Sequence, residues 1–247
     1  MTYREDQEIL EYSIRSVLNT FKQNPLEIYI MDDDNNPMEE EYIEKYKALS
    51  DCIRYERTTF DRHRNLNGKT CVVGMIEKFI EHAAGREDVL NLKIDPDTII
   101  CGRRLFDEVY NAPNSEYAST TRPGCHFSGI MYCFRTRPLK EALRLVKEFP
   151  VPDHKGPEDY IIGLAISAAS LPKLSLLISV WNESARGGVS AAWNYDIKEE
   201  NFHELVPYYC NIFQIITMGN WFLFKGGTKK DRLLPARLII EELESRN

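Results

Sequence analysis

Residues 89–100 contain the acid pair around which the chemistry of this chain can be organised. Apolar residues alternate along this stretch up to Ile94, as in a buried strand, and Asp95, Pro96 and Asp97 follow. Two carboxylates separated by one residue can reach a common cation, and Mg²⁺ or Mn²⁺ prefers such oxygen ligands together with substrate phosphates. The same residues also fit a simple Asp-Pro turn before a helix, so the pattern alone leaves both interpretations open.

A second acidic cluster, residues 32–34, follows another predicted strand at residues 27–31. In open α/β sheets, ligands bind at the carboxyl ends of the strands, and both acidic clusters fall at such ends. This coincidence favours a shared site. The alternative is that residues 32–34 form a solvated turn with Asn35 and Pro37.

Glu158 and Asp159 form a third acid pair, directly after Pro157. Proline at a first helical position and acids in the first turn are typical of a helix start and its dipole. A carboxylate placed there is also suited to remove a proton from an attacking hydroxyl group. Both interpretations fit the residues.

A polar loop spans residues 57–69 and contains Arg62, Arg64, Asn67 and Lys69. Its cations and the backbone near Gly68 are suited to contact a diphosphate. An exposed basic loop without a ligand is the alternative interpretation.

Composition excludes several classes of protein. The formal net charge of the 247 residues is −7, which argues against a general nucleic-acid-binding protein. No apolar run is long enough to span a membrane, and the first residues lack the hydrophobic stretch of a signal peptide. The six cysteines are dispersed and the five histidines have no spacing typical of zinc sites. We therefore expect a cytoplasmic protein with reduced cysteines.

Apolar spacing predicts alternating helices and strands. We expect helices around residues 6–21, with Asp6 as the N-cap, and around residues 42–49, 70–84, 105–109, 139–146, 157–168 and 231–245. We expect strands around residues 27–31, 53–55, 89–94, 129–135, 174–180 and 211–218. This alternation predicts an α/β fold with a mostly parallel central sheet flanked by helices. No repeat or linker divides the chain, so we expect a single domain.

Several motifs together resemble the GT-A-type glycosyltransferases, which use nucleotide-diphospho-sugars. The order of the motifs carries the resemblance: residues 2–5 (TYRE), 14–18 (IRSVL), 30–33 (IMDD), 93–98 (KIDPDT), 128–129 (SG) and 157–163 (PEDYIIG). It covers roughly residues 1–170. It implies a Rossmann-like GT-A fold, with residues 1–100 as the nucleotide-sugar-binding half and residues 101–247 as the acceptor-binding half.

The resemblance also implies roles for individual residues. Tyr3 would stack near the base, Asp33 with help from Asp32 would accept a hydrogen bond from a uracil-like edge, and Asp95 and Asp97 would hold Mn²⁺ or Mg²⁺. Asp159 would be the catalytic base, with Glu158 beside it. The nucleotide-sugar-binding set is Thr2, Tyr3, Arg4, Asp32, Asp33, Asn67, Lys69 and Asp95.

One departure from the family affects the first residues. The family has a full hydrophobic strand before its Thr-Tyr pair, whereas this chain has only Met1 there. Either that first strand is missing or the edge of the nucleotide site is built differently, which places the roles of Thr2 and Tyr3 in question.

The function that the resemblance implies is inverting, metal-dependent transfer of a sugar from a UDP-like donor to a hydroxyl acceptor. The acceptor would be a glycan, a lipid-linked molecule or a small molecule. Two alternatives stay open. One is a sugar-nucleotide nucleotidylyltransferase, although the glycine-rich loop of that class is not found, and the other is a non-catalytic nucleotide-sugar- or carbohydrate-binding protein of the same fold.

Overall fold

A computed structural model describes residues 2, 4–59, 68–86, 89–111, 117–121, 131–148, 161, 173–177, 180–181, 199–212, 214–217 and 233–246. The helices are the 3-10 helix η1 (Arg4–Asp6), α1 (Gln7–Thr20), α2 (Glu40–Lys47), α3 (Gly68–Ala83), α4 (Arg104–Asn111), α5 (Thr136–Glu148), α7 (Glu199–Ile212) and α8 (Leu233–Ser245). The strands are β1 (Ile28–Asp33), β2 (Ile53–Thr58), β3 (Leu90–Ile94), β4 (Thr98–Ile100), β5 (Tyr117–Thr121), β6 (Met131–Arg135), β7 (Lys173–Leu177), β8 (Val180–Trp181) and β9 (Ile215–Thr217).

The described strands form three sheets, in the orders β1-β2, β3-β6-β5-β7 and β4-β9-β8. The pairs β1–β2, β5–β7 and β8–β9 are parallel, whereas β3–β6, β5–β6 and β4–β9 are antiparallel. The fold is therefore mixed α/β. We expected one mostly parallel sheet, but the described strands form three sheets in which parallel and antiparallel pairs are equally frequent. For β5 and β6 the reason is chain length, because residues 122–130 are fewer than the dozen or so that a parallel crossover requires.

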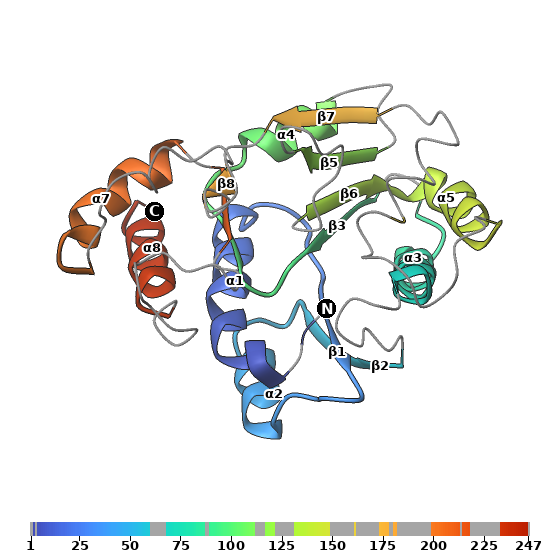
Figure 1. Ribbon diagram of the computed structural model, residues 1–247, viewed down its shortest axis with the longest axis horizontal. Helices are drawn as coiled ribbons and strands as arrows, with labels where there is room; N and C mark the ends of the chain where they lie inside the picture. Colours follow the sequence, from blue (N-terminus) through green and yellow to red (C-terminus); the bar gives the residue numbers. More distant parts are fainter. Residues whose placement is uncertain are drawn as a thin grey trace.

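Helices cover two flanks of the strands, with α7 and α8 side by side on one flank and α3 and α5 on the other (Figure 1). On the first flank, Ile9 of α1 packs with Ile99 of β4 and with apolar residues of α7, β9 and α8. On the second, Met31 of β1 packs against α3 and α5.

Helix α1 lies between the β1–β2 sheet and the helices α7 and α8, and it is buried on more than one side. Ile9 faces the cluster of α7 and α8, whereas Leu10 and Ile14 pack with Ile30 of β1 and with α2 and β2. Consecutive residues 9 and 10 thus contribute to different clusters. Helix α1 therefore joins the β1–β2 sheet to the C-terminal helices.

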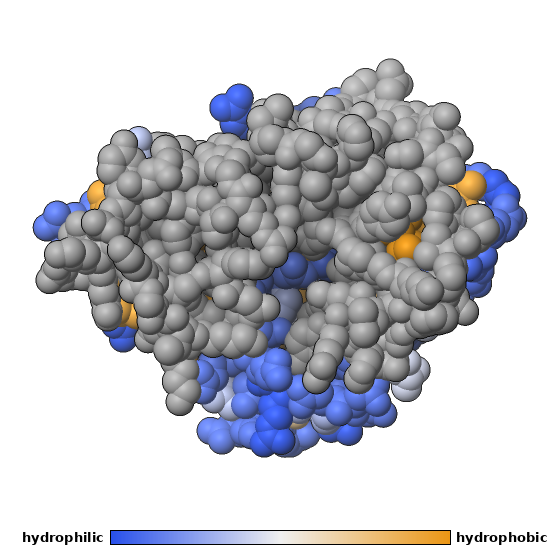
Figure 2. Space-filling model, in the orientation of Figure 1, coloured by the Kyte–Doolittle hydropathy of each residue, from blue (hydrophilic) through white to orange (hydrophobic). Residues whose placement is uncertain are grey.

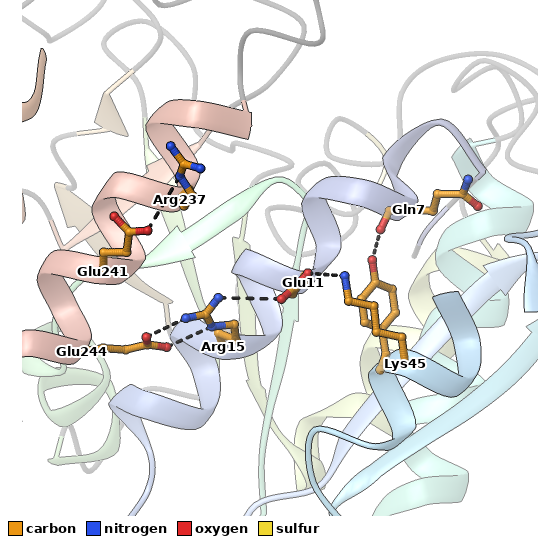
Figure 3. Close-up of polar contacts among 8 residues, drawn as sticks. Gln7, Glu11, Arg15, Lys45, Arg237, Glu241 and Glu244 are labelled. Carbon is orange, nitrogen blue, oxygen red and sulfur yellow. Dashed lines mark hydrogen bonds and ion pairs between the residues drawn. The ribbon is translucent and has the colours of Figure 1, made fainter. Parts of the chain in front are cut away.

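Ion pairs reinforce the position of α1 (Figure 3). Arg15 donates two hydrogen bonds to Glu244 of α8, at 2.9 and 2.6 Å, and Lys45 of α2 lies 2.7 Å from Glu11. All of these side chains are partly exposed, so each pair adds little stability and mainly fixes orientation.

The described surface over α2, at the lower edge of Figure 2, is hydrophilic. It fits the charged residues along that short helix, EEYIEKYK. Within the part of the chain that the structure describes, none of the helices is both long enough and apolar enough to cross a bilayer.

Several features differ from the sequence-based expectation. Residues 211–218, expected to be a strand, contain the end of α7 and only the short strand β9. Asp6 occupies the N-cap position of α1, but its side chain makes no capping hydrogen bond. The strand β4 was not expected either, because it follows Asp97 with only three residues.

We expect Ile99→Ala to lower the free energy of unfolding by about 3 kcal/mol, because Ile99 is fully buried and its removal leaves a cavity between α1, α7 and α8. Urea denaturation measures the change. Leu49→Ala is the control, since Leu49 is 36% exposed. Equal losses in both variants would contradict the assignment of Ile99 to the core.

Candidate active site

The carboxylate of Asp32 is buried at the carboxyl end of β1 and is bonded entirely within the protein. Its Oδ1 accepts from the Thr2 hydroxyl at 3.0 Å, and its Oδ2 accepts from the backbone N–H of Met38 at 2.9 Å and from the Tyr55 hydroxyl at 2.7 Å. Asp32 itself is 0% exposed. These donors satisfy a charge that would otherwise be costly to bury.

Tyr55 donates one of these bonds from β2. Burial raises the pKa of its phenol, a hydrogen bond from Arg57 lowers it, and the hydrogen bond to Asp32 raises it, with an upward net shift. The phenol therefore stays protonated at neutral pH and keeps its donor for Asp32. The register of β1 and β2, which pairs Asp32 with Arg57, sets this contact.

Thr2 lies alongside β1 in a parallel bridge with Asp32. Its N–H donates to the Met31 carbonyl at 2.8 Å, and its carbonyl accepts from the N–H of Asp33 at 3.1 Å. Thr2 is 3% exposed. The structure thus gives Thr2 a structural position at the edge of β1, beside the acids with which the sequence analysis grouped it.

Asp33 is the second acid of this strand end. Its Oδ1 accepts from the backbone N–H of Asn35 at 2.9 Å and from the Asn35 side chain at 3.2 Å, which holds a tight turn. Its Oδ2 makes no hydrogen bond with any residue that the structure describes. Asp33 therefore keeps acceptor capacity that Asp32 has already used.

Arg4 and Lys69 lie at the starts of η1 and α3. The backbone N–H of Arg4 donates to the Asn36 carbonyl at 3.0 Å, and its guanidinium forms an ion pair with Glu39. Lys69 occupies the first turn of α3 and is half-buried. No hydrogen bond or ion pair between described residues joins Thr2, Arg4, Asp32 or Asp33 to the second acid pair.

That second pair, Asp95 and Asp97, lies in the short turn between β3 and β4. The Nζ of Lys93, a residue with a 2% exposed side chain, lies 2.6 Å from Oδ1 of Asp95. The Asp95 carbonyl accepts from the N–H of Thr98 at 3.1 Å and closes the turn. Lys93 therefore orients Asp95 and neutralises part of the charge of the pair.

The donor set at this turn fits a hard divalent cation. Asp95 keeps a second oxygen that makes no hydrogen bond within the described residues, and Asp97 follows two positions later. The hydroxyl of Thr98 is buried and has no hydrogen-bond partner in the described part of the chain. A metal-bound water or a phosphate oxygen would satisfy such a group.

The remaining predicted site residues lie outside the described residues. They are Tyr3, Asn67, Glu158 and Asp159, together with Arg62 and Arg64 of the polar loop. Their roles stay predictions.

Another polar cluster was not found by sequence reasoning. Glu56 of β2 and Glu81 and His82 of α3 place one ligand atom each within 4.8 Å of one another, and His82 Nε2 lies 3.1 Å from Glu56. The Nζ of Lys78 pairs with both carboxylates, so an ammonium group already balances them. The His82 ring stacks on Tyr29 with centroids 3.6 Å apart. Only the packing of β2 against α3 brings these residues together, so their spacing in the sequence does not predict the cluster.

The solved structures that resemble this chain include two of the glycosyltransferase GlyE from Streptococcus pneumoniae TIGR4. The apo form aligns with a TM-score of 0.50 at 11% sequence identity, and the other crystal structure aligns with a TM-score of 0.48 at 13% identity. Each alignment covers 97% of this chain and 60% of the other, so the chain spans about 60% of the length of GlyE. No protein-family model and no curated protein sequence matches the chain.

The backbone of the chain follows a fold similar to that of GlyE. At this level of identity the likeness concerns the path of the backbone and does not extend to individual side chains. Since one fold can support many activities, the function has to be argued from the acid pairs themselves.

We expect Asp32→Ala to lower the free energy of unfolding by about 3 kcal/mol, because the N–H of Met38 and two hydroxyls would lose their buried acceptor. The urea midpoint should fall with an unchanged m-value. Asp34→Ala is the matched control, since Asp34 is exposed. Similar stability of the two variants would show that Asp32 is not needed to hold this strand end.

Proposed function

We propose that this protein is a GT-A-type, metal-dependent glycosyltransferase that transfers a sugar, with inversion, from a UDP-like nucleotide sugar to a hydroxyl acceptor. One observation carries the proposal. On a glycosyltransferase fold, the turn after β3 presents Asp95 and Asp97, with Lys93 oriented against Asp95 and an unpartnered Thr98 hydroxyl beside them. Oxygen donors of this kind suit a cation that carries a diphosphate.

The nucleotide end of the site would be built at β1. Asp33 has a carboxylate oxygen left to accept a hydrogen bond from the base, and Asp32 would support it by fixing the strand end. Tyr3 would stack near the base. Thr2 and Arg4 would contribute through the backbone bonds that hold the first residues against β1 and the following turn.

The diphosphate end would be built at the β3–β4 turn and the start of α3. Asp95 and Asp97 would hold Mn²⁺ or Mg²⁺, which, when bound, supplies Lewis-acid stabilisation of charge on the departing nucleoside diphosphate. Helix α3 begins at Gly68, so Lys69 and the positive end of the helix dipole coincide there. Asn67 and Lys69 would therefore contact the phosphates.

Lys93 has a consequence for the order of binding. The ammonium group of Lys93 already offsets part of the charge of Asp95. Asp95 and Asp97 therefore attract a free cation less strongly than two acids without a neighbouring lysine would. The diphosphate brings the remaining negative charge. We therefore expect metal and nucleotide to strengthen each other's binding.

The acceptor chemistry would fall to the acid pair at residues 158–159. Inverting transfer requires one base that removes the proton of the acceptor hydroxyl as its oxygen attacks the anomeric carbon. Asp159 would be this base, with Glu158 beside it as an acceptor ligand.

Calorimetric titration of UDP and GDP, each with Mn²⁺ and with EDTA, tests the donor site. We expect one nucleotide to bind in the presence of Mn²⁺, binding to be lost with EDTA, and Asp97→Ala to weaken it about tenfold or more. Asp97 is the better choice for this test, because Asp95→Ala would also remove the carboxylate that pairs with Lys93.

Asp51→Ala is the control for the titration, since Asp51 is exposed and precedes β2 at the end opposite Thr58. Its affinity should equal that of the unmodified protein. If neither nucleotide binds under any of these conditions, the metal-site proposal fails.

The catalytic proposal is tested by UDP release from a panel of UDP-sugars in the presence of candidate glycan acceptors. Asp159→Asn should lower the turnover number by about 100-fold or more and leave nucleotide affinity unchanged, because it removes only the base. Asp153→Asn, which changes an acid that precedes Pro157 in the sequence, is the control. Nucleotide binding without turnover in the unmodified protein would instead favour the non-catalytic binding protein.

A further inference from the structure

Two cysteines from distant parts of the chain pack in the apolar cluster formed by α1, β4, α7, β9 and α8. Cys101 directly follows β4, and Cys210 lies in the last turn of α7, where it is 4% exposed. Both pack in the cluster that contains Ile99 and Ile239. The N–H of Cys101 donates to the carbonyl of Gln214, four positions after Cys210, at 2.8 Å, so the two thiols lie close enough to share a hydrogen bond; both are free rather than joined.

The surroundings of the two thiols differ. The hydrogen bond from Cys101 and the nearby guanidinium of Arg246 lower the pKa of Cys210, although burial opposes this shift. The hydrogen bond to Cys210 and burial raise the pKa of Cys101. Thiolate character therefore collects on Cys210, with a protonated thiol in contact with it.

Arg246 is held in place for this role. Its guanidinium donates to the Pro207 carbonyl at 3.0 Å and to Asn211 Oδ1 at 2.8 Å, both in α7, and it pairs with Glu242 at 2.7 Å. A cation fixed against the helix turn that carries Cys210 is a recognised way to activate a thiol.

We propose that Cys101 and Cys210 form a redox-active pair that closes to a disulfide when the protein meets a peroxide. The Cys210 thiolate attacks one peroxide oxygen, the O–O bond breaks, and the sulfur becomes a sulfenic acid while the other oxygen leaves as water. The Cys101 sulfur then attacks the Cys210 sulfur, a second water leaves, and the S–S bond forms. Two electrons pass from the two thiols to the peroxide. Cys210 is buried but Cys101 is partly exposed, so a small oxidant can approach the pair from the side of Cys101.

Cys133 shows what an inert cysteine of this protein looks like. It is fully buried in β6, and burial raises its pKa to about 12. A guanidinium, that of Arg135, also lies near Cys133 and lowers its pKa, so the difference between Cys133 and Cys210 is the contact of Cys210 with a second thiol.

The test is to treat the reduced full chain with hydrogen peroxide and to map its cysteines by mass spectrometry of non-reduced peptides. We expect a loss of two hydrogens from the intact chain and a linked pair of peptides containing Cys101 and Cys210. Cys210 should react at least about tenfold faster than Cys133. The oxidised protein should also melt roughly 5 °C higher or more, because the link closes a long loop of the chain.

Variants separate the steps of the reaction. In Cys101→Ala the sulfenic acid on Cys210 should persist and be trapped by dimedone, whereas Cys210→Ala should form neither adduct nor link. Cys133→Ala is the control and should form the link at the rate of the unmodified protein. A link between other cysteines, or a Cys210 that reacts no faster than Cys133 in the unmodified protein, would overturn the proposal whether or not the variants fold.

Discussion

The carboxylate of Asp32 can remain buried only while three donors from separate segments point at it: the Thr2 hydroxyl, the N–H of Met38 and the Tyr55 hydroxyl. Each donor fixes a different piece of chain, namely the residue beside β1, the approach to α2, and β2. The same contacts fix the strand end from which the turn at Asp33 begins. They also fix the position of Met31, whose side chain packs against α3 and α5. A single buried charge thus sets the geometry of one end of the candidate site.

The two acid pairs follow the same physical logic. In each, one carboxylate is bonded within the protein beside a second acid. Asp32 serves the fold beside Asp33, which keeps one oxygen without a hydrogen bond among the described residues, and Asp95 is paired with the buried Lys93 two positions before Asp97. An acid that is already paired within the protein has a fixed backbone position, and it therefore also fixes the backbone of the acid close to it in the sequence. A rigid support of this kind is what an anionic ligand and its cation require, since both must be met at fixed distances.

The sequence predicted most helices and the strands that precede the acids, because their apolar periodicity is strong. It did not predict α7, since Pro207 lies inside that helix and interrupts the pattern, while burial of Val206, Tyr209 and Cys210 compensates. It named both Asp32 and Asp33 but could not distinguish their roles, which depend on donors 30 and 23 positions away from Asp32. The sequence also did not predict the Cys101–Cys210 pair or the cluster of Glu56, Glu81 and His82, because only packing between distant elements brings these residues together.

The packing of α1 against α8 links the two ends of the described chain, and this has a consequence for biosynthesis. Arg15 and Glu244 are 229 positions apart, and Ile9 shares its cluster with Ile239 and Ile240. During translation, α1 leaves the ribosome long before its partner helix exists, so its Ile9 face stays exposed to water and to other nascent chains. This part of the core can close only after α8 has been synthesised, so its formation depends on contacts between residues far apart in the sequence, which slow folding.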